Sequence, residues 1–522
     1  MEQTVAPLGH VIGFIDIGTN AIRLLVVRIN PNFSYTIISQ EKEVIRLGEN
    51  EFNDNLLKPE AMNRAIFVCG KFTSLAKTYG ATKMFAVGTS AIREAENKTV
   101  FLQRLFDETG LTVQVISGEE EARLVYRGVL SGIDIGKEKA LFVDLGGGST
   151  DIAIGDQHQL YYTFSIKVGA IRLTTQFIGE NWTKPIPDSV YKKMKDHVHQ
   201  NLHPVNAIVK ECGSHLAWGS SGTIINLAEI AGKLFKKNSS GLVLSKKNLK
   251  RLASRLCSLP LEERRKLPGI NPYRADIIVA GAAIMDALME DFGLEEICVS
   301  HKELRDGMLV DYLSNFEGYR ELQKTPLHTR SILHLGRSFN FDEKHSKTVS
   351  TLALQLFDSA KQLGLHYLSD KYRELLAYAA TLHDIGDIIS FNNHHLHSHY
   401  IISNAELYGF EPQEITIIAN VARFHRKKIP TNKTLKKINL TEEAKYAVMV
   451  LSMFLRLAEK LDRSHTGLIY KAEFIRNEEG VATLSFNSKT DCSLEKWSII
   501  QNRRAFFETF QKQLDVICIV DP

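Results

Sequence analysis

The stretch LFVDLGGGSTDIAIG, residues 141–155, repeats the pattern of an earlier stretch, GFIDIGTNAIRLLVV, residues 13–27. In each stretch an apolar strand pattern leads to an Asp, an apolar residue, a glycine-containing loop with hydroxyl side chains, and a second strand pattern. A second pair, AVGTS (residues 86–90) and AWGSSGT (residues 217–223), follows in the same order. This repetition predicts two duplicated α/β halves that face one another, with a ligand in the cleft between them.

The surrounding sequence sets the expected domain boundaries. Strand patterns in VIGFIDIG, IRLLVVRI and YTIISQEKEVI predict a three-stranded antiparallel meander, and a helix is expected from about Lys58 to Tyr79. Past about Ser314, long amphipathic helical patterns rich in histidine replace the strand patterns. We therefore expect three domains, at residues 1–135, 136–314 and 315–522, the last mainly helical with a small strand-bearing tail at ATLSF.

Composition narrows the class of protein. The 522 residues are 44% hydrophobic and 24% charged with a net charge of +4, so a site for a polyanion must be built locally. The chain has no apolar run long enough to span a membrane, and its start, MEQTVAPLGH, lacks a secretory pattern. The cysteines, which contain no C-x-x-C motif, predict reduced, mostly buried thiols and a cytoplasmic protein. They are Cys69, Cys212, Cys257, Cys298, Cys492 and Cys518.

The repeated loops, DIGTN at residues 16–20 and DLGGGSTD at residues 144–151, suit phosphate binding. Glycines in a tight turn let backbone N–H groups point at one spot and bind phosphate oxygens. Asp16 and Asp144 end their strands, where carboxylates are suited to hold Mg²⁺ directly or through water. The alternative is an ordinary glycine-rich hairpin with an Asp cap, which the repetition disfavours. The expected phosphate-binding residues of these loops are Gly18, Thr19, Asn20, Gly146, Gly147, Gly148 and Ser149, with Thr150 as a further donor.

Three consecutive acids, Glu119 to Glu121, open a helix that follows the strand TVQVIS. The helix dipole alone favours acids in a first turn. A carboxylate beside a phosphate cleft can instead orient and deprotonate a water molecule, but the pattern does not choose among the three acids. Arg93 and Arg274 are candidates for contacting phosphates, although most single arginines are solvated surface residues. The chain has no P-loop signature and no kinase H-R-D or D-F-G set, which excludes those two classes by their signatures.

Together these residues resemble the exopolyphosphatase / guanosine pentaphosphate phosphatase family of the actin-like ATPase superfamily. The resemblance runs in order over about residues 11–310 and includes FIDIGTNAIRLLVV, AVGTSAIREAEN, ISGEEEARLVYRGV, VDLGGGSTDIAIG, VGAIRLT, GSSGT, LPGINPYRADIIVAGAAI and VSHKELRDGML. It implies two actin-like (ribonuclease H-like) subdomains with the active site between them, and Mg²⁺-dependent removal of a terminal phosphate. Longer members of the family carry a helical C-terminal domain of the kind expected here.

The resemblance also implies roles for single residues. Glu121, the last acid of GEEEAR, is the implied general base. The loop from Asp144 to Ser149 is implied to bind metal and phosphate, the loop with Thr19 and Asn20 to bind phosphate, and Thr89, Ser90 and Arg93 to lie near the same cleft. Three positions depart from the family pattern, since Thr19 replaces Ser, and Asp151 and Asp306 each replace Glu. The shorter side chain of Asp151 puts in doubt whether this catalytic candidate reaches the metal or water.

In the C-terminal region, His345 and His383-Asp384 resemble the H…HD…D pattern of HD phosphohydrolases. Imidazoles and a carboxylate that converge between helices can bind a divalent metal, so we expect a tentative second metal site here. The last acid of the pattern is Glu459 or Asp462. The histidines at 394, 395, 397 and 399 either extend a metal site, contact substrate phosphates or are ordinary polar residues. The favoured interpretation is a degenerate scaffold that lengthens the substrate channel and helps the chain dimerise.

The sequence therefore leaves several functions open. The first hypothesis is an exopolyphosphatase that releases orthophosphate from the end of inorganic polyphosphate, and the second is a guanosine pentaphosphate phosphohydrolase with the same chemistry. The long helical region, with basic residues such as Lys427 and Arg503, slightly favours a long polyanion. A sugar kinase of the same fold and a non-catalytic nucleotide sensor are weaker alternatives. We expect a homodimer, and we expect neither a nucleic-acid partner nor a membrane span.

Overall fold

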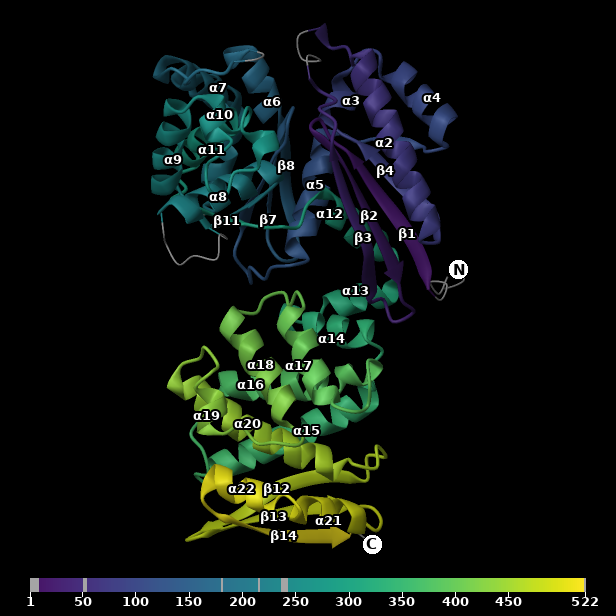
Figure 1. The fold of residues 1–522 in the computed structure, drawn as a ribbon, viewed down its shortest axis with the longest axis vertical. Coiled ribbons are helices and arrows are strands. Elements are labelled where there is room, and N and C mark those ends of the chain that lie inside the picture. Colours follow the sequence, from purple (N-terminus) through teal and green to yellow (C-terminus); the bar gives the residue numbers. More distant parts are fainter. Residues whose placement is uncertain (1–8, 50–53, 180–181, 215, 236–242, 521–522) are drawn as a thin grey trace. The chain divides into compact units, whose positions relative to one another are not determined.

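The computed structural model describes residues 9–49, 54–179, 182–214, 216–235 and 243–520. The chain forms two compact units, Met1–Glu321 and Leu322–Pro522, and each unit can be followed in Figure 1 by its colours. The first eight residues, which belong to the stretch that lacks a secretory pattern, lie outside the described residues. Within the described ranges, no helix is both long enough and apolar enough to cross a membrane.

The first half of unit 1 is a five-stranded sheet of order β3-β2-β1-β4-β5. Its first three strands form the predicted antiparallel meander, and β4 and β5 add to it in parallel. The predicted helix at Lys58–Tyr79 is present as α2, which packs against β1, β2 and β4. The elements are β1 (His10–Ile17), β2 (Ala21–Ile29), β3 (Tyr35–Val44), α2 (Pro59–Thr78), β4 (Ala81–Gly88), α3 (Ser90–Glu94), α4 (Lys98–Thr109) and β5 (Val113–Val115).

The second half repeats this sheet. Its strand order is β10-β11-β9-β6-β7-β8, so β8-β7-β6-β9-β11 matches β3-β2-β1-β4-β5, as the duplication predicts. The strands are β6 (Ala140–Leu145), β7 (Thr150–Gly155), β8 (Leu160–Ile166), β9 (Leu216–Ser220), β10 (Val243–Ser245) and β11 (Glu296–Val299). The helices are α6 (Ala170–Leu173), η1 (Thr174–Ile178), α7 (Asp188–Cys212), α8 (Gly222–Phe235), α9 (Lys246–Ser258), α10 (Leu261–Arg264), η2 (Pro272–Arg274) and α11 (Ile278–Asp291).

Two helices, α5 (Gly118–Leu130) and α12 (Leu304–Leu313), lie between the two sheets, as Figure 1 shows. They share one core with residues of both sheets, among them Phe14 of β1 and Phe142 of β6. The helices approach at two glycines. A Cβ on Gly307 would lie 1.9 Å from the carbonyl oxygen of Leu124, and a Cβ on Gly128 would lie 2.7 Å from that of Glu303. The two backbones can approach this closely only because neither glycine has a side chain.

Unit 2 is mainly helical, with a three-stranded sheet of order β12-β13-β14 at its C-terminal end. The predicted strand ATLSF lies in β13, the central strand, which pairs antiparallel with β12 and parallel with β14. The junction helix is α13 (Glu317–Gln323). The other elements are α14 (Leu327–Ser338), α15 (Glu343–Gln362), α16 (Asp370–Leu382), η3 (Ile385–Ile388), α17 (His394–Asn404), α18 (Pro412–Phe424), α19 (Asn432–Leu435), α20 (Glu442–Leu461), β12 (Ile469–Glu478), β13 (Val481–Ser488), α21 (Ser493–Ile500), α22 (Arg503–Phe510) and β14 (Gln513–Val520).

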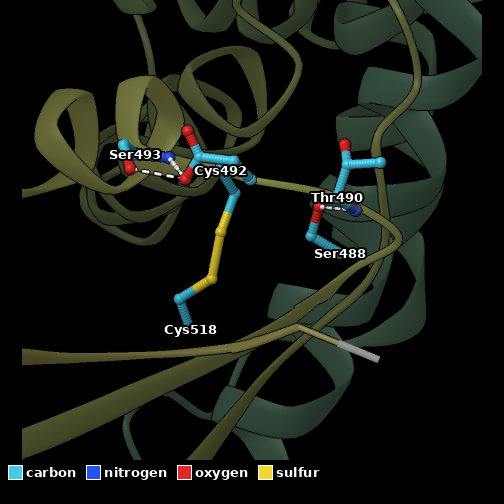
Figure 2. Close-up of a disulfide and its surroundings, with 6 residues drawn as sticks. Ser488, Thr490, Cys492, Ser493 and Cys518 are labelled. Carbon is cyan, nitrogen blue, oxygen red and sulfur yellow. Dashed lines mark hydrogen bonds between the residues drawn. A yellow bond between two sulfur atoms is a disulfide. The ribbon is translucent and has the colours of Figure 1, made fainter. Parts of the chain in front are cut away.

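The cysteines differ from the expectation of six reduced thiols. Cys492, which precedes α21, and Cys518 on β14 form a disulfide, drawn in Figure 2. The prediction was wrong for this pair because the two residues share no local motif, and the fold brings them together across 26 positions of sequence. The other four are free thiols, of which Cys69 and Cys257 are buried and Cys212 and Cys298 are half-buried.

We expect Gly307→Ala to destabilise unit 1, because the added methyl group would force α12 away from α5. Overpacking of this kind costs about 1–3 kcal/mol of the free energy of unfolding. Urea unfolding of the variant and the wild type measures the difference. The matched control is Gly70→Ala in α2, where the new methyl would meet only an ordinary contact at 3.5 Å and favours the helix. Equal stability of Gly307→Ala and wild type would contradict the close contact.

Candidate active site

A cavity of about 70 Å³ lies between the two halves of unit 1. Both glycine loops line it, together with the start of α5 and the start of α8. The fold therefore brings together most of the predicted residues, which belong to segments far apart in the sequence. Those that line the cavity are Asp16, Gly18, Thr19, Asn20, Thr89, Ser90, Glu121, Asp144, Gly146, Gly147, Gly148, Ser149 and Arg274.

The two loops are equivalent hairpin turns. Gly18 N donates to Ala21 O at 3.1 Å in the first, and Gly146 N donates to Ser149 O at 2.9 Å in the second. The loops meet directly, since a Cβ on Gly147 would lie 3.0 Å from the side chain of Thr19. A bulkier residue at 147 would push the two halves apart, so the small residue sets the width of the cleft.

Asp16 belongs to a chain of ion pairs that crosses the floor of the cavity. The Nη1 atom of Arg23 on β2 lies 3.1 Å from Asp16 Oδ2, and its Nε lies 2.9 Å from Glu303 Oε2 at the start of α12. Burial raises the pKa of the Asp16 carboxyl, and the charge of Arg23 opposes that shift. Arg23 thus pairs with two carboxylates at once, the buried Asp16 on β1 and the half-buried Glu303 at the start of α12.

Asp144 occupies the matching place in the second half. Ser220 on the adjacent strand donates to Asp144 Oδ1 at 2.5 Å. Burial raises the pKa of Asp144 to about 6, although the Ser220 hydrogen bond opposes it. Asp144 also pairs in register with Asp151 on β7, as Asp16 pairs with Arg23 on β2. Asp151 in the second half and Arg23 in the first half therefore occupy equivalent positions, one with a carboxylate and the other with a guanidinium.

Asp151 lies behind the lining of the cavity. It is buried, and Ser149 donates to its Oδ2 at 3.2 Å. Burial raises the pKa of Asp151 to about 7, and the nearby charge of Asp144 adds to this effect. Asp151 itself does not line the cavity, whereas its partner Ser149 does.

Of the three acids that open α5, only Glu121 lines the cavity. Glu119 is exposed, and Glu120 pairs with Arg123 at 2.7 Å on the outer side of the helix. Burial raises the pKa of Glu121 well above its usual value, and the charge of Asp151 adds to the rise. The helix start that left three candidates in the sequence thus presents one of them to the cavity.

Arg93 holds Glu121 and does not itself line the cavity. Its Nη1 donates to Glu121 Oε2 at 3.0 Å and to the carbonyl oxygen of Ile116 at 3.1 Å. The guanidinium is therefore tied to the segment that begins α5, and it fixes the direction of the Glu121 carboxylate. The sequence suggested a phosphate contact for this arginine, whereas the structure gives it a contact with the carboxylate.

The wall opposite α5 is formed by the start of α8 and by Arg274. The Nη1 atom of Arg274 donates to Thr223 Oγ1 at 2.9 Å, and burial lowers the pKa of this guanidinium to about 10. Ser221 has a φ of 94°, a rare conformation for a residue with a side chain. The strained turn and the N-terminal end of a 14-residue helix both line the cavity, and backbone N–H groups at a helix start suit an anion.

Four lining residues with polar or charged side chains had no role in the sequence-based prediction: Arg23, Ser221, Thr223 and Glu303. Arg23 carried a signal, because a charged residue within the apolar strand IRLLVV needs a buried partner. Ser221 and Thr223 lie in the repeated GSSGT element. Glu303 gave no local signal, because its contact with Arg23 joins residues 280 positions apart.

In unit 2, the predicted metal-site residues His345, His383 and Asp384 lie together, with one ligand atom from each within 4.8 Å of the others. Of the two acids considered for the end of this pattern, Asp462 contacts His345 Nδ1 at 2.8 Å, and Glu459 pairs with Lys460. The described residues also form a second group, Asp384 with His394 and His425. His425 was absent from the prediction.

Comparison with known proteins agrees with this geometry. Residues 25–316 match the model of the Ppx/GppA phosphatase family, and residues 327–502 match that of Ppx/GppA phosphatase, domain III. An exopolyphosphatase from Cytophaga hutchinsonii, solved as a crystal structure, is similar with a TM-score of 0.55 and 27% identity, over 59% of this chain and 99% of that one. The crystal structure of an exopolyphosphatase-like protein matches with a TM-score of 0.52 and 25% identity, over 58% of this chain and 98% of that one.

These likenesses confirm the predicted fold of two duplicated actin-like subdomains followed by a mainly helical region. The family model for residues 25–316 alone covers more than half of the chain and includes all but two of the carboxylates and arginines described above for unit 1. The two exceptions, Asp16 on β1 and Arg23 on β2, are register partners in the first sheet. The chain therefore belongs to the Ppx/GppA phosphatase family and is a phosphoanhydride hydrolase.

Proposed function

We propose that this chain is an exopolyphosphatase, which removes the terminal phosphate from inorganic polyphosphate, with Glu121 as the general base. The observation that carries this proposal is the position of Glu121, a buried carboxylate that lines the same cavity as the two glycine loops. A binding protein has no need of a carboxylate there, because its charge repels a phosphate. A hydrolase needs one to activate water.

The residues of the cavity fit a divalent cation. Asp16 and Asp144 both line it, and both are carboxylates whose pKa burial has raised, so a cation beside them would stabilise their charge. The buried Oδ1 of Asn20 has no partner among the described residues and offers a neutral oxygen. Mg²⁺ prefers such oxygen ligands and keeps several waters. When bound, Mg²⁺ would neutralise charge on the phosphate oxygens.

The chemical step is an in-line displacement by water. A water molecule beside Glu121 gives one proton to that carboxylate, and its oxygen forms a bond to the terminal phosphorus. The bond from this phosphorus to the bridging oxygen breaks, and the bridging oxygen leaves with the electron pair as the new end of the shortened chain. The products are orthophosphate and a polyphosphate one unit shorter. The raised pKa of Glu121 makes it a stronger base for this transfer.

The remaining polar groups position the chain end. The two glycine loops and the strained turn at Ser221 line the cavity, and backbone N–H groups in such turns suit phosphate oxygens. Arg23 and Arg274 supply positive charge on the floor and the opposite wall. These groups act on charge that spreads over the phosphate oxygens as the bond breaks.

The shape of the cavity favours the end of a phosphate chain over a nucleotide. About 70 Å³ accommodates little more than a terminal phosphate, and no described lining residue carries an aromatic ring on which a purine could stack. A polyphosphate presents the same group at every round of cleavage. Guanosine pentaphosphate, which contains the same terminal bond, remains the alternative substrate, and a homodimer stays a prediction from the sequence.

Glu121→Gln should lower kcat for orthophosphate release by about 10²–10⁴-fold, because the amide cannot accept the proton of water. Binding of polyphosphate and the unfolding temperature should stay close to those of the wild type. The matched control is Glu120→Gln, one position earlier on the outer side of α5, which should turn over normally. Near-normal turnover by Glu121→Gln would remove Glu121 from the mechanism.

Two arginine variants separate positioning from substrate binding. Arg93→Gln releases the Glu121 carboxylate, so we expect kcat to fall while KM stays within about threefold. Arg274→Gln removes charge from the wall of the cavity, so we expect KM for polyphosphate to rise. Steady-state kinetics on both variants make the comparison. A higher KM with unchanged kcat for Arg93→Gln would instead show that Arg93 contacts the substrate.

The preferred substrate can be identified by measuring orthophosphate release from long polyphosphate and from guanosine pentaphosphate side by side. Both assays contain Mg²⁺, and ATP is the control. We expect a kcat/KM for polyphosphate at least tenfold above that for the nucleotide, because the cavity lacks a platform for a purine. Chelation of Mg²⁺ should abolish release from both. A preference for guanosine pentaphosphate would replace the proposed substrate while leaving the chemistry of Glu121 in place.

A further inference from the structure

Unit 2 contains a cavity of about 850 Å³, which we call the basic cavity. Its walls come from α17, from the segment between the end of α18 and α19, from α20, and from the segment between the end of α21 and α22, all within unit 2 (Figure 1). Pockets that hold small organic ligands measure about 300–1,000 Å³. The residues of the unit 1 cavity have no part in the basic cavity, so the inference below does not depend on the proposed function.

The basic cavity carries an excess of positive charge. The only acid among its described lining residues is Glu508, and this acid pairs with Arg504 at 2.9 Å. The other lining cations have no carboxylate within 4.0 Å in the described part of the chain. The protein therefore leaves five positive charges around one cavity without an ion-pair partner, which favours an anionic ligand. These cations are Arg423, Arg426, Lys427, Lys428 and Arg456.

Arg456 is the buried member of this set, with an exposed fraction of 7%. Its Nη2 donates to the carbonyl oxygens of Phe424 and Lys427, both at 3.0 Å. Its Nε has no hydrogen-bond partner among the described residues. Arginine is seldom buried unless it is paired, because a buried charge without a partner is costly. An anion in the cavity would supply the missing acceptor.

The cationic wall is held in place by the protein itself. Four of the five cations lie between Arg423 and Lys428, where α18 ends. Lys427 Nζ donates to Oδ1 of Asn393, which precedes α17, and both residues have a left-handed backbone, with φ of 59° and 66°. This hydrogen bond joins the start of α17 to the segment that carries the cations, so the wall is formed before any ligand arrives.

Other parts of the wall are neutral. Gln501 and Asn502 contribute amides, and Leu396 and Ala505 contribute apolar side chains. His395 is buried, with an exposed fraction of 5%, and its Nδ1 has no hydrogen-bond partner among the described residues. A hydroxyl group can both donate and accept, so it would satisfy this nitrogen in either tautomer.

The two kinds of wall together indicate the chemistry of the ligand. A guanidinium can donate two parallel hydrogen bonds to a phosphate, and a single phosphate carries about two negative charges, which would leave most of the five cations unpaired. The amide and apolar side chains suit an uncharged part of the same molecule. We propose that the basic cavity binds a small organic molecule of nucleotide size, in which a diphosphate is attached to a neutral body that carries hydroxyl groups.

Binding of ADP to the full chain tests the proposal. Equilibrium dialysis counts the ADP molecules bound per chain, and a chelator suppresses hydrolysis in unit 1. We expect the double variant Arg423→Gln with Lys428→Gln to bind one ADP fewer per chain than the wild type, because two of the unpaired cations are gone. Any ADP in the cavity of unit 1 cancels in this difference. Circular dichroism checks that the variants are folded.

A second variant reaches the same cavity from another helix. Leu396→Glu, at a half-exposed position of α17, adds a negative charge to the wall and should also lose one ADP. The matched control is Lys436→Gln with Lys437→Gln, which removes two exposed lysines of the same region that do not line the cavity. It should bind as much ADP as the wild type. Equal binding by the wild type and both cavity variants overturns the proposal, and so does an equal loss in the lysine control.

Two further compounds test which part of the ligand the cavity recognises. Each is measured as a competitor of the ADP that the double variant loses. Adenosine, which has no phosphate, should not compete. Tripolyphosphate, which has no neutral body, should bind about tenfold more weakly than ADP, because the neutral wall stays unfilled. Tripolyphosphate binding as tight as that of ADP would identify a site for inorganic phosphate chains and overturn the proposal. The readout is bound ligand, so it holds whether or not the chain degrades polyphosphate.

Discussion

The site of unit 1 depends on the contact between α5 and α12, where Gly128 and Gly307 let two backbones touch between the sheets. This contact fixes the two sheets at one separation, because both helices share a core with residues of each sheet. It also aims the starts of both helices at the cleft, so that Glu121 in the first turn of α5 and Glu303 at the cap of α12 line the same cavity.

Within that frame, charge governs the chemistry. Asp16, Asp144 and Asp151 are buried, and burial raises the pKa of all three carboxyl groups. Arg23 and Arg274 lie against them without neutralising the whole cluster. A buried excess of carboxylate oxygens is stable only with a cation or with protons, and a phosphate chain carries its own negative charge to the same place. In this cavity, the binding of the cation, the binding of the substrate and the charge of the base therefore depend on one another.

Much of unit 1 was predictable because it is encoded locally. The duplication, the meander and the two glycine loops each follow from a short motif, and the structure has them where the sequence placed them. The roles that depend on distant partners were not predictable. The contact of Arg93 with Glu121 was not foreseen, and Cys492 was expected to be a free thiol but is bonded to Cys518. Such pairings arise from packing, which no local pattern records.

The sequence by itself determined which residue types the cleft can use, because motifs such as DLGGGSTD set the turn, its glycines and its carboxylate in one short segment. It also marked His345, His383 and Asp384 as a group. The resemblance implied Glu121, and the tertiary structure shows that Glu121, and neither of its two neighbours, lines the cavity. Only the tertiary structure decided that His394 and His425 join His345 and His383 around the Asp384 carboxylate. The physical reason is the same in both places: the direction of a side chain is set by what its helix packs against, and that packing involves residues far away in the chain.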